Sequence, residues 1–233
     1  MTHPVRSQWI DIASGFAGYL ALPPGGHGPG LVLFQEIFGV NEHIQGVAQQ
    51  YALAGFVVLA PDVFWRQAPK VELGYEGEDW NRAIALMKAY PTEEALSDIA
   101  QTVKVLRGRP EVGGRKVGAL GYCMGGRLAY QAAATTDIDA AVPYYGGGIH
   151  TQLERVAHIS CPMQFHYASD DANIPLEAVE QVRQSFAGKS AQVHVYPNSH
   201  HGFNCWARGS YDAGSAALAH GRSLQFLAEQ LFG

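Results

Sequence analysis

The sequence predicts an α/β protein in which a mostly parallel central sheet is covered by helices on both faces. Short apolar segments alternate with helical patterns along the chain, as expected of parallel strands joined by helices. Apolar runs such as LVLF and FVVLA lack polar alternation, which is typical of strands buried on both faces. Turn-forming pairs such as Pro23-Pro24 and Pro61-Asp62 bound the early segments.

The expected elements follow one another in a regular order. Strands are expected at residues 16–22, 31–34, 56–60, 116–120, 140–145, 163–167 and 192–196. Helices are expected at residues 41–54, 92–107, 127–134, 175–186 and 215–231. Residues 63–90 are less regular, and we expect them to form a helical excursion over the active site.

Bulk composition favours one domain that binds a small molecule. The 233 residues are 47% hydrophobic and 16% charged, so residues 1–233 are expected to bury a single core. A net charge of -5 without a Lys/Arg cluster disfavours nucleic acid or an anionic membrane as partner. No signal peptide or membrane span is apparent, which favours a soluble, cytoplasmic protein.

Cysteine usage points the same way. The chain has three cysteines, Cys123, Cys161 and Cys205, and no CxxC spacing. An odd number without that spacing argues against a disulfide framework and against a structural zinc site. Reduced thiols are therefore expected, with no metal and no organic cofactor.

The pentapeptide Gly121-Tyr122-Cys123-Met124-Gly125 lies between an expected strand and an expected helix. It matches a nucleophile elbow in which cysteine replaces the usual serine. The flanking glycines leave room for a strained turn, and the helix N-terminus behind the sulfur favours a thiolate. The alternative is a buried cysteine in a glycine-flanked turn without chemistry.

A catalytic thiol needs a base and an orienting carboxylate, and both follow later strands. Asp171 comes after strand 163–167, although Asp170 and Asp171 also suit the cap of the helix that starts near Pro175. His200 and His201 come after strand 192–196. Parallel strands end at one edge of a sheet, where open α/β folds bind ligands, so cysteine, Asp171 and histidine are expected to meet there.

A further carboxylate, Glu36, follows the apolar strand 31–34 directly. We expect it to face the thiol, although an ordinary charge at a strand end has the same pattern. The N–H groups of Ile37 and of Met124, the residue after the nucleophile, are expected to form the oxyanion hole.

The segments QEIFGVN, PDVFWRQAP, GYCMGG, YYG and HHGF occur in this order, together with the spacing from Asp171 to Pro175. With them the chain resembles the dienelactone hydrolase (carboxymethylenebutenolidase) family over nearly its whole length. The resemblance implies an α/β-hydrolase fold and a triad of Cys123, Asp171 and His201, since His201 directly precedes Gly202-Phe203. It also implies that Glu36 takes the cysteine proton when substrate binds, so that the thiol is latent in the free enzyme, and it implies no cofactor.

Residues that choose the substrate match the family less well. The family holds a substrate carboxylate with two arginines, and Trp80 and Cys205 stand at those places here. Arg82 and Arg208 lie close by and are candidate replacements, whereas tryptophans would suit a more apolar pocket for uncharged esters. The full set of expected substrate-binding residues is Trp80, Arg82, Tyr144, Tyr145, Phe203, Trp206 and Arg208.

The leading hypothesis is a cysteine-dependent hydrolase that opens a dienelactone or a related small cyclic ester through a thioester, in the degradation of aromatic compounds. One alternative keeps the triad but takes neutral aryl or alkyl esters. Another is a non-catalytic binding or thiol-sensing module. The expected state is a monomer or a weak homo-oligomer, with no partner other than the small ester or lactone.

Overall fold

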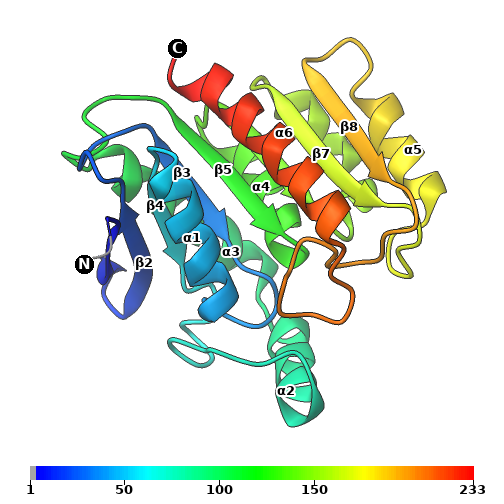
Figure 1. Cartoon of the computed structure of the whole chain (residues 1–233), viewed down its shortest axis with the longest axis horizontal. Helices are drawn as coiled ribbons and strands as arrows, with labels where there is room; N and C mark the ends of the chain where they lie inside the picture. Colours follow the sequence, from blue (N-terminus) through cyan, green and yellow to red (C-terminus); the bar gives the residue numbers. More distant parts are fainter. Residues whose placement is uncertain (1–3) are drawn as a thin grey trace.

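The computed structural model describes residues 4–233, apart from the side chains at positions 92 and 93. A central sheet has the strand order β1-β2-β4-β3-β5-β6-β7-β8 (Figure 1). The pairs β1–β2 and β2–β4 are antiparallel, and every later pair is parallel. The strands are β1 Arg6–Ala13, β2 Phe16–Leu22, β3 Gly30–Phe34, β4 Val57–Pro61, β5 Val117–Tyr122, β6 Ala140–Tyr144, β7 Met163–Ala168 and β8 Ala191–Tyr196.

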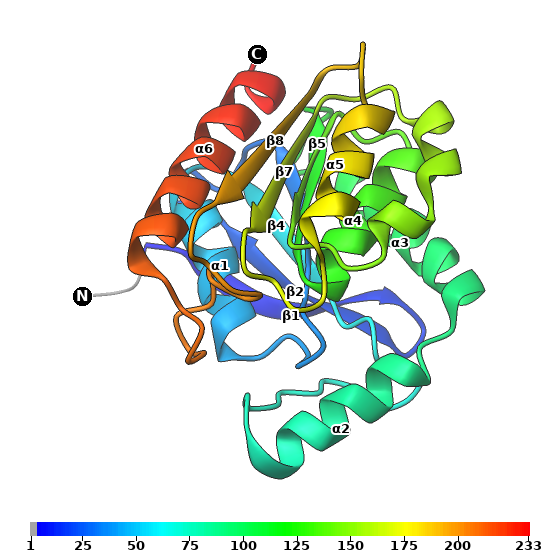
Figure 2. The same ribbon diagram turned by 90° about the vertical axis from the view of Figure 1, so that its right-hand side faces the viewer.

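Helices cover both faces of the sheet (Figure 2). Helices α1 and α6 lie on one face, and α3, α4 and α5 lie on the other, while α2 lies apart, beyond one edge of the layers (Figures 1 and 2). Among residues 4–233, no helix combines the length and apolar character needed to cross a membrane. The helices are α1 Glu42–Leu53, α2 Gly77–Lys88, α3 Thr92–Arg107, α4 Met124–Thr135, α5 Leu176–Ser185 and α6 Ala213–Leu231, with short 3₁₀ turns at Ile149–Thr151 and Leu153–His158.

The predicted α/β class and parallel sheet are confirmed. Strands β3 to β7 are buried at every position, which explains their continuous apolar sequences. Each predicted strand and helix coincides with an observed one, and the irregular segment does contain a helix, α2. Strand β1 was not predicted, because this edge strand is largely exposed and mixes polar with apolar residues. The first three residues of the predicted domain lie outside the described part of the chain.

Candidate active site

Cys123 stands on the tight turn between β5 and α4, with φ 56° and ψ −117°. A Cβ added to Gly121 would lie 2.1 Å from the carbonyl oxygen of Gly125, and one added to Gly125 would lie 2.2 Å from that of Phe34. Only glycine fits such approaches. Helix α4 begins at Met124, before the predicted residue 127. Backbone strain of this kind is typical of a nucleophile elbow.

Asp171 and His201 meet as predicted, although 30 residues separate them in the sequence. His201 Nδ1 lies 2.7 Å from Asp171 Oδ2, and the Asp171 side chain is only 1% exposed. The Asp171 carboxylate also accepts the N–H of Asn173, at 2.8 Å, whereas the N-cap of α5 is Pro175. The alternative of Asp171 as the helix cap is therefore wrong: it orients the imidazole instead.

His201 also lies beside Cys123. The two residues line the same cavity and interact electrostatically, so Asp171, His201 and Cys123 lie together at one site. Burial lowers the pKa of His201, but the charge of Cys123 and the bonds to Asp171 and Cys123 outweigh it and raise that pKa to about 10. His200, in contrast, is exposed, and its Nδ1 lies 3.0 Å from the carbonyl oxygen of Asp170. The raised pKa favours the imidazolium form of His201 at neutral pH.

Two backbone positions border the sulfur on the cavity side. Ile37 and Met124 line the same cavity as Cys123 and His201. Met124 is the first residue of α4, so its N–H has no acceptor within the helix. Ile37 lies in the turn after β3, the strand that pairs with β5 in parallel. This placement suits the predicted pair of oxyanion donors.

Glu36 occupies a different environment from the predicted one. Its side chain is 1% exposed and forms an ion pair with Arg208, with 3.0 Å between Oε1 and Nη1. Its other oxygen accepts a weak hydrogen bond from the Tyr75 hydroxyl, at 3.4 Å. Within the described residues, neither oxygen forms a hydrogen bond with Cys123. The transfer of the cysteine proton to Glu36 stays a prediction.

A cavity of about 240 Å³ opens at Cys123 and His201. Trp80, Ile84 and Met87 close it from α2, which confirms the expected excursion over the site. The complete lining is Ile37, Phe38, Trp80, Ile84, Met87, Cys123, Met124, Arg127, Gly147, Asn173, His201 and Arg208. The cavity is therefore small, mostly apolar and supplied with two guanidinium groups.

Sequence reasoning missed Arg127, one of these two guanidinium groups. It lies one helical turn after Cys123, and its N–H is bonded to the Cys123 carbonyl oxygen at 3.3 Å. Residues four apart share one face of a helix, and this spacing is the signal that marks Arg127 as a cavity residue. Among the described residues no carboxylate forms an ion pair with it.

Several expected substrate-binding residues lie elsewhere. Arg82 is exposed on α2 and does not line the cavity. Tyr144 and Phe203 are fully buried in the core, where the Tyr144 hydroxyl bonds to Ser223 at 2.7 Å. The structure corrects these three expectations because side chains packed in the core or directed to solvent cannot reach a ligand in the cavity.

The last two residues of the expected set lie near the site without lining it. Tyr145 is fully buried beneath the His201 ring, with 5.0 Å between ring centroids. Trp206 lies against His43, at 4.2 Å between centroids, and borders two other hollows instead. Trp80 and Arg208 are thus the two members of the expected set that line the cavity.

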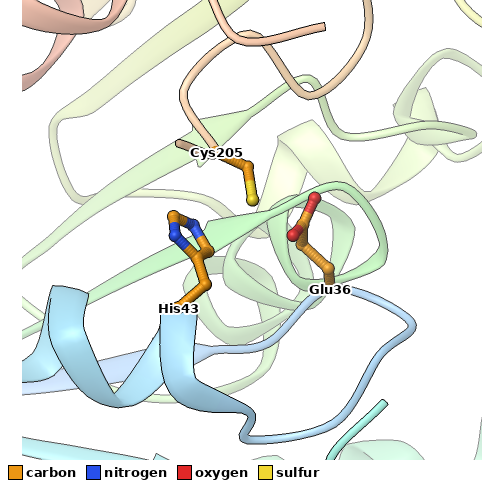
Figure 3. A group of neighbouring side chains, drawn as sticks. All are labelled: Glu36, His43 and Cys205. Atoms are coloured by element: carbon orange, nitrogen blue, oxygen red, sulfur yellow. The ribbon is translucent and has the colours of Figure 1, made fainter. Parts of the chain in front are cut away.

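Three potential metal donors cluster beside Glu36. Glu36, His43 and Cys205 are all buried, and their ligand atoms lie within 4.8 Å of one another (Figure 3). Burial lowers the pKa of His43 and raises that of the Cys205 thiol to about 12. Oxygen, nitrogen and sulfur donors together form a set that suits a transition metal ion.

Comparison with known proteins identifies the family of the chain. The family model described as the dienelactone hydrolase family matches residues 16–231. The carboxymethylenebutenolidase of Pseudomonas putida is 34% identical over 215 residues, covering 91% of each chain. Carboxymethylenebutenolidase 1 of Cupriavidus pinatubonensis is 33% identical over 218 residues, again covering 91% of each.

A solved structure extends the likeness to the fold. The crystal structure of a candidate dienelactone hydrolase from Klebsiella pneumoniae superposes with a TM-score of 0.85 at 28% identity, covering 97% of this chain and 99% of the other. The strand order, the turn at Cys123 and the match over residues 16–231 therefore all point to the same family. The chain belongs to the dienelactone hydrolase family and is a hydrolase that acts on ester bonds.

Proposed function

We propose that this protein hydrolyses a small, negatively charged ester or lactone through a thioester on Cys123. The row Cys123–His201–Asp171, which opens onto the cavity, carries this proposal. The proposed nucleophile and its base line the same cavity, and the base is held by a buried carboxylate, as covalent hydrolysis requires.

The reaction follows from these contacts. The Cys123 thiolate attacks the carbonyl carbon, and the resulting oxyanion is stabilised by the N–H groups of Ile37 and Met124. Collapse breaks the bond to the leaving oxygen, which takes the proton of the His201 imidazolium. Neutral His201 then removes a proton from water, and the hydroxide attacks the thioester. The thiolate leaves, and the product is a carboxylate that, for a lactone, still carries its alcohol or enol.

The cavity limits the substrate to a small molecule and favours an anion. Arg127 provides a positive charge one turn from the nucleophile, and its guanidinium is suited to bind a carboxylate through two bonds. Arg208 lies at the cavity with Glu36 as its partner, so we assign Glu36 the role of positioning this guanidinium. A dienelactone, which carries a ring ester and a carboxylate, has both features.

The apolar lining supports a second candidate. Ile37, Phe38, Ile84 and Met87 all face the cavity, and an uncharged aryl ester could bind through them alone. In this second candidate the triad acts in the same way, but Arg127 contributes nothing to binding.

The experiment compares a dienelactone with p-nitrophenyl acetate as substrates. Cys123→Ala is expected to abolish turnover of both, and full activity in this variant would sink the mechanism. Arg127→Met is expected to lower kcat/KM for the dienelactone by about 10- to 100-fold, the usual value of a hydrogen bond to a charged group, and to leave the neutral ester nearly unchanged. Arg82→Met is the matched control, since it removes an exposed guanidinium outside the cavity. Unchanged kcat/KM for both substrates in Arg127→Met would favour the neutral-ester candidate.

A further inference from the structure

We propose that Glu36, His43 and Cys205 form a binding site for a divalent transition metal ion, with Zn²⁺ as the best match. The three donors come from the end of β3, the first turn of α1 and the loop before α6 (Figure 3). They are 0%, 2% and 0% exposed.

An unpartnered histidine is the second observation. Neither Nδ1 nor Nε2 of His43 has a hydrogen-bond partner among the described residues, although the side chain is almost fully buried. A buried imidazole without any partner loses its hydration and gains nothing in return. Its ring lies in the cluster with Glu36 and Cys205, so a bound ion gives the missing partner (Figure 3).

The donor chemistry selects the metal. A thiolate, an imidazole and a carboxylate are all ligands of Zn²⁺, which is usually bound by three protein ligands where a fourth position stays open. Ligand atoms around tetrahedral Zn²⁺ lie about 3.5 Å apart, as follows from bonds of roughly 2.0–2.3 Å. The ligand atoms of the three residues lie up to 4.8 Å apart here, and side-chain movements of about 1 Å would bring them to that spacing.

A route to the site exists from the surface. A second cavity, of about 520 Å³, is lined by His43 and Tyr75 and shares no lining residue with the cavity at Cys123. Glu42 and Glu72, both exposed, also line it. Carboxylates at the entrance attract cations, so a divalent ion reaches the buried donors without crossing the substrate cavity.

The ion pair between Glu36 and Arg208 competes with the metal for the same carboxylate. Binding replaces the Cys205 proton, which passes to the solvent, so that Glu36 and the Cys205 thiolate together balance the two positive charges of Zn²⁺. Metal binding therefore weakens the ion pair between Glu36 and Arg208. This effect is independent of the hydrolysis reaction.

The site is tested by isothermal titration calorimetry, in which Zn²⁺ is added to the full chain after treatment with a chelator. One equivalent is expected to bind, and Co²⁺ in its place is expected to give a thiolate charge-transfer band. His43→Gln and Cys205→Ala are each expected to weaken Zn²⁺ binding by at least about tenfold, and Cys205→Ala to remove the band. Thermal unfolding without metal shows that each variant is folded, and Zn²⁺ is expected to raise Tm in the parent but not in these variants.

Matched variants separate this site from other thiols. Cys161→Ala and Cys123→Ala are expected to bind Zn²⁺ like the parent, and because the readout is binding, the result does not depend on whether Cys123 is the nucleophile. Loss of binding in Cys123→Ala with retention in Cys205→Ala would overturn the proposal. Crystals soaked in Zn²⁺ give the final test: an anomalous peak bonded to Cys205 Sγ supports the site, and a water on His43 without such a peak refutes it.

Discussion

The buried ion pair between Glu36 and Arg208 gives a stability prediction with a definite size. The Glu36 side chain is 1% exposed and that of Arg208 is 13% exposed, with 3.0 Å between Oε1 and Nη1. Arg208→Met keeps much of the aliphatic volume but leaves the carboxylate with the Tyr75 hydroxyl, 3.4 Å away. Removing one partner of a buried pair costs about 3–5 kcal/mol. For a chain of this length, Tm should fall by roughly 6–20 °C.

The measurement is urea unfolding of parent and variants in buffer with EDTA, which keeps metal out of the comparison. The double variant Glu36→Gln with Arg208→Met removes both charges and is expected to regain at least about 2 kcal/mol over Arg208→Met alone. Arg183→Met is the matched control, because the pair of Arg183 with Glu180 is exposed and worth about 0–1 kcal/mol. The reasoning is refuted if Arg208→Met costs no more than Arg183→Met, or if the double variant regains nothing.

Three further predictions concern the elbow, the core and the base. Gly125→Ala places a Cβ 2.2 Å from a backbone oxygen of β3 and is expected to cost more than about 3 kcal/mol in urea unfolding; parent-like stability would contradict it. Tyr144→Phe is expected to cost about 1 kcal/mol by losing the bond to Ser223 and to leave kcat/KM unchanged, because the residue lies outside the cavity; a fall in kcat/KM with a stable fold would contradict this. Burial lowers the pKa of His201, but the charge of Cys123 is the main cause that raises it to about 10. Because the pKa of His201 is higher in the folded than in the unfolded chain, its protonation stabilises the fold fully below about pH 6.5. This stabilisation is lost as the pH rises through about 10. The unfolding free energy should therefore fall over this window in the parent and much less in Cys123→Ala, and identical pH profiles would disprove the coupling.

The sheet and the pairing of Asp171 with His201 were predictable because local sequence carries their signals. An apolar run such as that of β3 marks a strand buried on both faces, and parallel strands bring their carboxyl ends to one edge. Asp171 and His201 were found because each directly follows such a strand. Strand β1 lacked the signal, since Arg6, Ser7 and Gln8 are exposed at the sheet edge.

Substrate contacts were harder to predict because they depend on which way a side chain faces. Trp80 and Arg82 are two positions apart on α2, about 200° around the helix axis, so the tryptophan reaches the cavity while the arginine faces solvent. The assignment of Arg82 failed for this reason, and only the position of α2 over the site decides between the two. Arg127, by contrast, had a usable local signal in its spacing from Cys123.

The metal cluster had no signal in the sequence, because Cys205 lies more than 160 residues after His43 and no short ligand spacing joins them. The loop from β8 to α6 explains how the cluster and the active site come together. This one segment carries His201, Cys205 and Arg208, which are the proposed base, a proposed metal donor and a guanidinium at the cavity. Glu36 is paired with Arg208 and lies within 4.8 Å of the Cys205 sulfur, so it cannot bind a metal and neutralise Arg208 fully at once. A metal that draws Glu36 away leaves Arg208 with an uncompensated charge beside the cavity, and the electrostatic attraction for an anionic ester then increases rather than decreases.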